Sequence, residues 1–418
     1  MRAYTLWMVA LMNAANIGCG PERTEETNDW LASREGAITS MRPALKGVMS
    51  RDIVAKPPPQ TMASFITHNV VSLGWDELEE PGSGTKPSGF FAPGTRGWKA
   101  IDDAIVAGSK VRLRIRAGVR APAYVKRIGF GGLFDGGGDC SDGGVYVVLP
   151  IDGLGGCVPK FWLPAYLARY EALMEEVARR YGDTHAVRDV VDTACMTIHG
   201  EPFYRAGKDA PSYARLAAAG LTPGKDRYCH QQALVIHERV FASIRTSLAV
   251  NPWDLIDPNA PTGRNPSWPA TWDLLEAGPS SQWYVDAAGA ATTDRWPGAR
   301  GLLGNRLVLQ NNGLGEDDVC AEPTSASAQS SHFCYLAFTA ANTGHSVGFQ
   351  TESMRRLCGG APCGDEDTEA RMLGKALDNA LVMGARFVEL PGGYEDWTQT
   401  EHVESLRVYD SALDSNSP

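Results

Sequence analysis

Three glutamates stand at the ends of short apolar runs, where their carboxyl groups could do acid and base chemistry. Glu201 lies in the segment TIHGEPF, Glu352 in VGFQTES and Glu389 in FVELPGG. A single carboxylate in such a place can equally form an ion pair with a neighbouring arginine. Two carboxyl groups that flank one opening, one protonated and one ionised, can cleave a glycosidic bond. These glutamates are therefore the first candidates for catalysis.

Apolar runs rich in β-branched residues alternate with long connections, several of which have helical periodicity. The alternation predicts a parallel sheet, and eight runs predict an α/β fold with one closed (β/α)8 barrel, a TIM barrel. The carboxyl ends of all strands then meet at one opening, which Glu201, after the fourth run, and Glu352, after the seventh, would share. The runs are Gly47–Val54, Asn69–Trp75, Val111–Gly118, Val187–His199, Ser247–Asn251, Arg306–Asn311, Ser346–Thr351 and Arg386–Leu390; the clearest connecting helices are Trp162–Tyr181, Gln232–Arg245 and Glu369–Met383.

The placement of the two glutamates resembles the clan of (β/α)8 retaining glycoside hydrolases that includes β-galactosidases, cellulases and β-mannanases. In that clan the acid/base glutamate ends strand four and the nucleophile ends strand seven, so the resemblance gives these roles to Glu201 and Glu352. It extends over about residues 47–397, and the segment WDELEEP at residues 75–81 is similar to β-galactosidase-like members. The resemblance implies cleavage of β-glycosidic bonds in a carbohydrate substrate by double displacement.

One residue departs from the pattern of the clan. Its members usually have asparagine directly before the acid/base, where it binds the sugar 2-hydroxyl, whereas this sequence has Gly200. His199, Asn251, Asn311 or Asn312 could supply the missing hydrogen bond. The departure also motivates a second hypothesis, a catalytically inactive barrel at the cell surface that binds glycans.

Arginines on the third run are further candidates. Arg112, Arg114 and Arg116 alternate with apolar residues, so all three side chains point to one face of the strand. If the apolar set packs on helices, the arginines enter the barrel, where Arg112 and Arg114 could form a ladder of buried ion pairs. Arg116 is nearest the opening and is expected to bind substrate and to keep Glu352 ionised. Glu389, on the eighth run, is a further candidate to bind substrate.

Aromatic rings near strand ends could stack on the apolar faces of sugars, although barrel openings also carry aromatic residues for packing. Trp253 follows the fifth run and Trp397 follows the eighth, and these two are the preferred candidates. Trp75, at the end of the second run, is a third. The remaining aromatic residues near strand ends are Phe203, Tyr204 and Tyr394.

Cysteine spacing favours an exported protein. Six cysteines fall into close pairs within loop-like sequence, a pattern typical of disulfides, while Cys195 and Cys229 are either bridged or reduced. A zinc site is the alternative, but the chain has no Cys-x-x-Cys, His-x-His or His-Glu-x-x-His, so we expect no metal and no cofactor. The close pairs are Cys140 with Cys157, Cys320 with Cys334, and Cys358 with Cys363.

The first residues have the pattern of an export signal. Arg2 precedes an apolar stretch at residues 6–17 that is too short to span a bilayer. Gly18 before Cys19 resembles the lipobox of bacterial lipoproteins, which would make Cys19 a lipid anchor in the cell envelope; an ordinary secretory signal is the alternative. The expected organisation is a signal peptide at residues 1–18, a polar tether at 19–45 and a catalytic barrel at 46–418.

Composition narrows the partners. The 418 residues include 39 basic and 49 acidic side chains, a net charge of −10, mixed along the chain. No basic field exists that could neutralise phosphates, so nucleic acid is not expected as a partner, and a membrane is expected only through the lipid anchor. The 45 glycines and 26 prolines have no period and lie between patterned segments, which indicates a globular chain with long loops.

Overall fold

Eight parallel strands close into a barrel in their order along the chain, and the last strand pairs with the first. The predicted TIM barrel is confirmed in this computed structural model, which describes residues 40–51, 60–79, 95–130, 140, 143–150, 153–277, 283–320 and 322–416. The barrel strands are β1 (Gly47–Ser50), β2 (His68–Gly74), β3 (Lys110–Arg116), β6 (Val187–Val191), β7 (Arg245–Ala249), β12 (Leu307–Leu314), β13 (Ser346–Thr351) and β14 (Phe387–Glu389).

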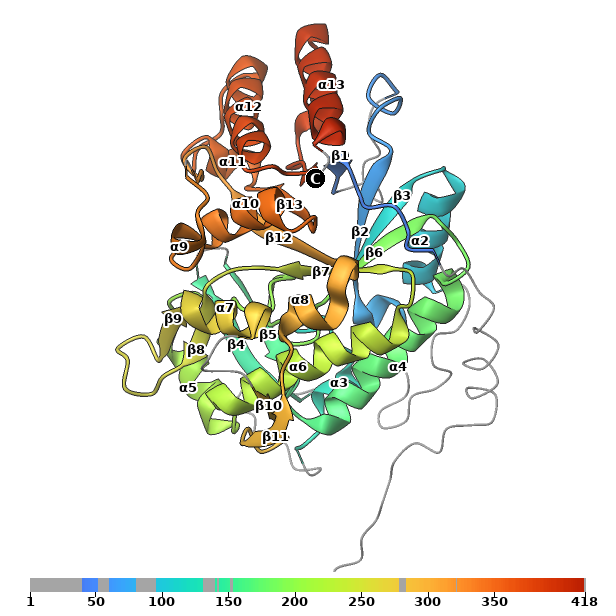
Figure 1. The fold of residues 1–418 in the computed structure, drawn as a ribbon. Coiled ribbons are helices and arrows are strands. Elements are labelled where there is room, and N and C mark those ends of the chain that lie inside the picture. The colour runs from blue at the N-terminus through green and yellow to red at the C-terminus, as the bar shows by residue number, and fades with distance from the viewer. Residues whose placement is uncertain are drawn as a thin grey trace, which may run out of the picture. The chain divides into compact units, whose positions relative to one another are not determined.

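Helices lie around the barrel (Figure 1) and short hairpins extend the loops. The larger helices are α2 (Arg96–Val106), α4 (Pro164–Tyr181), α5 (Ala210–Ala218), α6 (Pro223–Val240), α7 (Trp268–Glu276), α10 (His332–Asn342), α12 (Glu366–Val382) and α13 (Thr400–Ser415). The shorter ones are α3 (Ala123–Lys126), α8 (Gly298–Leu303), α9 (Ser325–Ala328) and α11 (Met354–Leu357), with 3-10 turns η2 (Trp75–Glu77), η4 (Gly304–Arg306) and η5 (Tyr394–Asp396). The hairpins pair β4 (Val145–Leu149) with β5 (Leu154–Val158), β8 (Trp253–Ile256) with β9 (Arg264–Ser267), and β10 (Trp283–Val285) with β11 (Ala291–Arg295).

The start of a helix is set by capping where its apolar stripe gives no signal. Helix α6 begins at Pro223, nine residues before the predicted start at Gln232, because the Thr222 side chain accepts from the Lys225 N–H and proline suits the first turn. Helix α12 likewise begins three residues early, since Asp365 caps the Thr368 N–H. The predicted start at Trp162 is two residues early, since α4 begins at Pro164.

The fourth strand is shorter than predicted. β6 ends at Val191, whereas the apolar run continues to His199. The Asp192 N–H still donates to the Ser247 carbonyl of β7 at 2.8 Å. Beyond it the backbone bonds to side chains of α4: the Tyr166 hydroxyl donates to the Ala194 carbonyl at 2.6 Å and the Tyr170 hydroxyl accepts from the Thr193 N–H at 3.3 Å. Residues 192–198 therefore form a buried loop that leads to half-buried His199.

The structure does not describe the N-terminal segments that the sequence predicts. The predicted signal peptide, Cys19 and the tether up to residue 39 lie outside the described residues, as do residues 52–54 of the first run. Within the part of the chain that is described, no helix combines the length and apolar character that crossing a bilayer requires.

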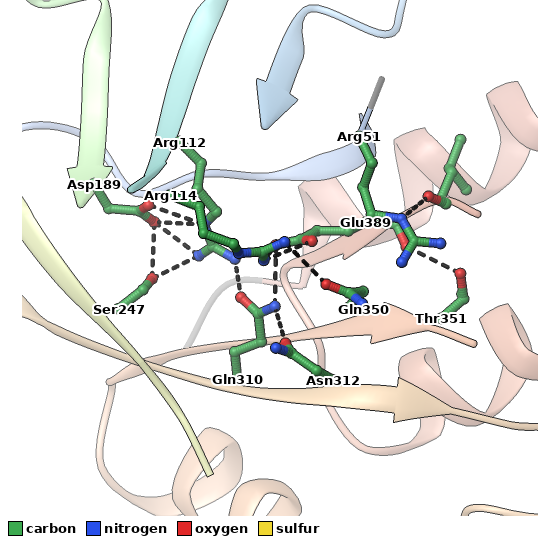
Figure 2. A network of polar contacts seen from close by, with 11 residues as sticks. Arg51, Arg112, Arg114, Asp189, Ser247, Gln310, Asn312, Gln350, Thr351 and Glu389 are labelled. Carbon is green, nitrogen blue, oxygen red and sulfur yellow. Dashed lines mark hydrogen bonds and ion pairs between the residues drawn. The ribbon is translucent and has the colours of Figure 1, made fainter. Parts of the chain in front are cut away.

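A charged network fills the interior of the barrel (Figure 2). On β3, Arg112 Nη2 lies 2.8 Å from Asp189 Oδ2 of β6, and Arg112 Nη1 lies 2.9 Å from Glu389 Oε1 of β14. Arg114 Nη2 lies 2.7 Å from the same Glu389 oxygen. The two guanidinium groups and the two carboxylates balance, and the two cations hold the pKa of fully buried Glu389 down at about 2 against the effect of burial. The predicted ion-pair ladder at Arg112 and Arg114 is confirmed.

Neutral side chains from the neighbouring strands complete this network. Ser247 Oγ on β7 donates to Asp189 Oδ2 at 3.1 Å, and Gln310 Nε2 on β12 donates to Glu389 Oε1 at 3.0 Å. The Thr351 hydroxyl on β13 donates to the Glu389 carbonyl at 3.1 Å. Side chains or backbone from six of the eight strands therefore meet in one polar layer.

Four disulfides join cysteines of the described residues. The three predicted close pairs, Cys140–Cys157, Cys320–Cys334 and Cys358–Cys363, are confirmed. Cys195 and Cys229, which the sequence left open, are also bridged and tie the loop after β6 to α6. Each bridge holds a connection outside the barrel strands.

Replacing Glu389 with glutamine should lower the free energy of unfolding by about 3–5 kcal/mol, because it leaves buried arginine charge without its counter-ion. Urea denaturation with the disulfides intact measures this loss. Asp103→Asn is the matched control: Asp103 forms an exposed pair with Lys99 on α2, so its loss should be under about 1 kcal/mol. An equally small loss for Glu389→Gln would contradict the role of the network.

The same variant should change the acid sensitivity of the protein. Because folding lowers the pKa of Glu389 to about 2, its ionisation stabilises the fold fully above the unfolded value near 4.5, and this contribution is lost as the pH falls from there towards 2. The stability difference between wild type and Glu389→Gln should therefore narrow over that interval.

Candidate active site

A cavity of about 710 Å³ opens where the barrel strands end at their carboxyl termini. Glu201, from the loop after β6, and Glu352, directly after β13, both line it. These strands are the fourth and seventh of the barrel, so the two carboxyl groups enter the cavity from different sides. The other predicted site residues that line it are Arg116, His199, Asn311 and Asn312, with Asn251 beside them.

Four predicted binding residues lie outside this cavity, and three of them, two tryptophans and Glu389, are fully buried in the interior. Trp75 is fully buried, donates from Nε1 to Glu79 Oε1 at 2.6 Å and packs edge-on against Tyr166. Trp253 is also fully buried and donates from Nε1 to Asp226 Oδ2 at 2.9 Å. Glu389 belongs to the charged network and has no exposed surface. The prediction that these residues bind substrate is wrong, because each side chain is already enclosed by partners in the interior.

Trp397 lies at a different hollow. It donates from Nε1 to Glu369 Oε2 at 3.0 Å and lines a second cavity of about 500 Å³ beside Cys363 and Asp365. The prediction that Trp397 binds substrate in the main cavity is therefore also wrong. The hydrogen bond to Glu369 of α12 holds the indole at this second cavity. The contact joins segments that are distant in sequence, so strand placement alone does not reveal it.

The loop that carries Glu201 is held from below by a buried arginine. Arg205 pairs with Asp226 of α6, and its guanidinium also donates to the Cys195 carbonyl. The Arg205 N–H donates to Asp254 Oδ2 at 3.1 Å. Together with the Cys195–Cys229 disulfide, these contacts fix both flanks of Glu201 to α6 and β8.

The backbone of Glu352 is fixed to a neighbouring strand, and its carboxyl group lies near charges of both signs. Its N–H donates to the Leu314 carbonyl of β12 at 3.0 Å. Burial raises the pKa of Glu352, the Asp318 carboxylate raises it further, and Arg356, whose Nη1 lies 3.8 Å from Glu352 Oε1, lowers it; the net direction is upward. Arg356 therefore favours the ionised form of Glu352 against the effects of burial and of Asp318.

The cation beside Glu352 differs from the predicted one. Arg116 was expected to keep Glu352 ionised, but Arg356, one helical turn further along the chain, takes that position. The acidic groups near Arg116 are Glu77 and Asp76, and its pKa is lowered by burial and by Arg120. The expected pairing is wrong because β3 and β13 stand on different sides of the barrel.

Gly200 directly precedes Glu201, and its surroundings leave little room for a side chain. A Cβ at this position would lie 2.9 Å from Arg114 Cδ. Arg114 cannot easily withdraw, because its guanidinium bonds to both oxygens of Glu389 at 2.7 and 2.8 Å and to Gln350 Oε1 at 3.1 Å. The charged network thus crowds a Cβ atom at residue 200.

Two asparagines offer a partner for a hydroxyl group. Asn311 Nδ2 donates to Asn251 Oδ1 at 2.8 Å, while Asn251 Nδ2 and Asn311 Oδ1 are buried and have no hydrogen-bond partner. Both residues line the cavity. One remaining donor and one remaining acceptor match a hydroxyl, which both accepts and donates a hydrogen bond.

Several lining residues were missed by the sequence analysis. Asp318, His332 and Phe333 come together because the Cys320–Cys334 disulfide ties the loop after β12 to the first turn of α10. The predicted Cys320–Cys334 pair could have indicated these residues. Cys320 lies shortly after a barrel strand, so the residues around both cysteines are expected near the opening. Other lining residues that were missed include Arg51, Ser72, Gln350 and Arg356.

No cluster of three or more histidine, cysteine, aspartate or glutamate side chains that could hold a metal ion is found among the described residues. The chemistry available in the cavity is that of carboxyl groups, arginines, amides and imidazoles.

Comparisons with known proteins give a likeness of fold. Neither a protein-family model nor a curated protein sequence matches the chain. An endo-1,4-β-mannanase from Rhizomucor miehei is similar at 8% identity, over 90% of this chain and 98% of that one, with a TM-score of 0.43. The catalytic domain of the major endoglucanase from Xanthomonas campestris pv. campestris is similar at 13% identity, over 90% and 99%, with a TM-score of 0.39. The catalytic domain of Thermobifida fusca endoglucanase Cel5A, in complex with cellotetraose, is similar at 12% identity, over 92% and 99%, with a TM-score of 0.37.

Gly200→Ala should lower the free energy of unfolding by about 1–3 kcal/mol, because the added methyl group presses on an arginine that the network holds in place. Thermal or urea unfolding measures the change. Gly374→Ala on α12 is the matched control, since its Cβ would meet only the Tyr409 hydroxyl at 3.5 Å and alanine favours the helix. If both variants are as stable as wild type, Arg114 does not constrain residue 200.

Proposed function

We propose that this protein is a glycoside hydrolase that cleaves β-glycosidic bonds by a retaining double displacement. The observation that carries the proposal is the presence of Glu201 and Glu352 in one cavity at the carboxyl end of a TIM barrel, in the segments that follow strands four and seven. The reaction requires two carboxyl groups that flank the glycosidic bond.

In the first step, the Glu352 carboxylate attacks the anomeric carbon and a bond forms between them. The bond from that carbon to the leaving oxygen breaks, and the Glu201 carboxyl group gives its proton to this oxygen. In the second step Glu201 takes a proton from water while the water oxygen attacks the anomeric carbon. Glu352 is released as a carboxylate, and the sugar keeps its original anomeric configuration.

The surroundings of the two glutamates support these roles. Arg356 favours the ionised form of Glu352, as a nucleophile requires, and opposes the effects of burial and of Asp318. The open donor on Asn251 and the open acceptor on Asn311 suit a sugar hydroxyl and compensate for the asparagine that Gly200 replaces.

An inactive barrel that binds glycans is the second candidate, and the observation in its favour is Gly200. Such a barrel would bind a glycan in the same cavity, through the same asparagine side chains, but would not hydrolyse it. In either case we propose an exported protein, supported by four disulfides of the kind that persist outside the cytosol. Fatty-acid labelling of Cys19 tests the lipid anchor.

Chemical rescue distinguishes the two glutamates. The full-length chain is tested on aryl β-glycosides with a good leaving group: the galactoside, glucoside, mannoside, xyloside, fucoside and glucuronide. Glu352→Ala should lose at least about 10³-fold in kcat and regain turnover with azide, giving the α-glycosyl azide, because azide attacks in place of the carboxylate. Glu201→Ala should be rescued to the β-glycosyl azide, since azide then replaces water in the second step.

Glu404→Gln, which removes an exposed carboxylate on α13, is the control and should match wild type. Nuclear magnetic resonance of the first-formed product assigns its anomeric configuration. Turnover that survives both alanine variants would refute the assignment of these residues. Binding of a glycoside by wild type with no turnover of any of them would instead support the inactive barrel.

The acid limb of the pH profile should follow Glu352, which reacts only when ionised. Asp318→Asn removes a carboxylate that raises the pKa of Glu352, so the limb should move to lower pH. Arg356→Gln removes the cation that lowers this pKa, so the limb should move to higher pH, by about 1 unit. The measurement is kcat/KM against pH on the best aryl glycoside. Shifts in the same direction, or none, would rule out Glu352 as the group that sets the limb.

A further inference from the structure

The wall of the main cavity is rich in arginine although the chain as a whole is acidic. Arg51, Arg114, Arg116 and Arg356 all line it, while the chain carries a net charge of −10. The acidic residues of the lining are Glu201, Asp318 and Glu352. A local concentration of cations in an acidic protein raises the question of what balances each one.

Three of these arginines have partners that explain them. Arg114 is bound to both oxygens of Glu389 and belongs to the balanced network inside the barrel. Arg356 lies 3.8 Å from Glu352. Arg51 donates from Nε to the Leu390 carbonyl at 2.5 Å.

Arg116 is different. Among the described residues no carboxylate forms an ion pair with it within 4.0 Å, and its Nε is buried without a hydrogen-bond partner. The nearby acids are already engaged, since Arg120 Nη2 lies 3.1 Å from Asp76 Oδ1 and 3.3 Å from Glu77 Oε1. Arg114 and Arg120 add repulsion of like charge. A half-buried cation in these surroundings is unfavourable unless an anion joins it.

The position of Arg116 relative to the glutamates defines where such an anion would sit. Arg116 ends β3, and Ser72 of neighbouring β2 and Arg51 beyond β1 line the cavity on the same side. Glu352 follows β13, three strands away from β2 around the barrel. A sugar ring held between the glutamates can therefore direct a substituent towards Arg116.

We infer that the cavity accepts a saccharide bearing an anionic group, which Arg116 binds. This inference rests on the proposed function for the sugar and names the class to which that sugar belongs. A carboxylate, as in a uronic acid, or a sulfate ester can accept two parallel hydrogen bonds from a guanidinium group. Neutral sugars leave the Arg116 charge uncompensated.

The test is a binding measurement on matched ligands. The ligands are an aryl β-glucoside, the β-glucuronide, which differs only in carrying a carboxylate at C6, and the glucoside 6-sulfate. Isothermal calorimetry with Glu352→Gln separates binding from turnover. One or both anionic ligands should bind roughly 10- to 100-fold more tightly than the neutral one. The difference should shrink as salt is added.

Arg116→Gln should abolish this preference while leaving the weak affinity for the neutral glucoside in place. Arg371→Gln, which removes an exposed arginine of α12 away from the cavity, is the control and should keep it. A preference for the glucuronide identifies the anion as a carboxylate, and a preference for the 6-sulfate identifies it as a sulfate ester.

Three results would overturn the inference: equal affinity for the neutral and anionic ligands, a preference that survives Arg116→Gln, or no binding of any of the three. Failure of the proposed hydrolysis has a separate signature, since it would appear as absent turnover by wild type even where Arg116-dependent binding is measured.

Discussion

The balance of charge inside the barrel is the constraint on which the rest of the structure depends. Arg112, Arg114, Asp189 and Glu389 are almost completely removed from water, so each must meet its counter-charge at hydrogen-bond distance. This requirement links β3, β6 and β14, which are far apart in sequence. It also reaches the cavity, since Arg114 touches the network at one end and excludes a side chain at residue 200 at the other. The charged network inside the barrel therefore also limits the space in the cavity at Gly200.

The two glutamates are held in different ways. Glu352 follows its strand directly, so the barrel itself fixes its backbone. Glu201 stands ten residues beyond the end of β6, on a loop whose position depends on Arg205, Asp226 and the Cys195–Cys229 bridge. Positioning of one carboxyl group comes from the sheet, and positioning of the other comes from α6. The residues around Arg205 therefore matter to the site although they are buried behind it.

The sequence predicts those features that follow from local pattern. Alternating residues on the third run placed Arg112 and Arg114 inside the barrel, and strand order brought Glu201 and Glu352 to one opening. Tryptophans were misplaced because the direction of a ring after a strand end depends on distant partners, Glu79 for Trp75 and Asp226 for Trp253. The cation near Glu352 was misassigned for the same reason: one turn of a short helix after β13 is not visible as a pattern.

The disulfides beside the cavity give the site a stability separate from that of the barrel. Cys195–Cys229 holds the loop that carries Glu201, and Cys320–Cys334 holds the wall formed by Asp318 and Phe333, whereas no barrel strand is crosslinked among the described residues. A reducing compartment would therefore loosen the cavity wall while the hydrogen-bonded barrel persists. The barrel would then remain folded, while the loop of Glu201 and the wall with Asp318 would lose the covalent links that hold them in place.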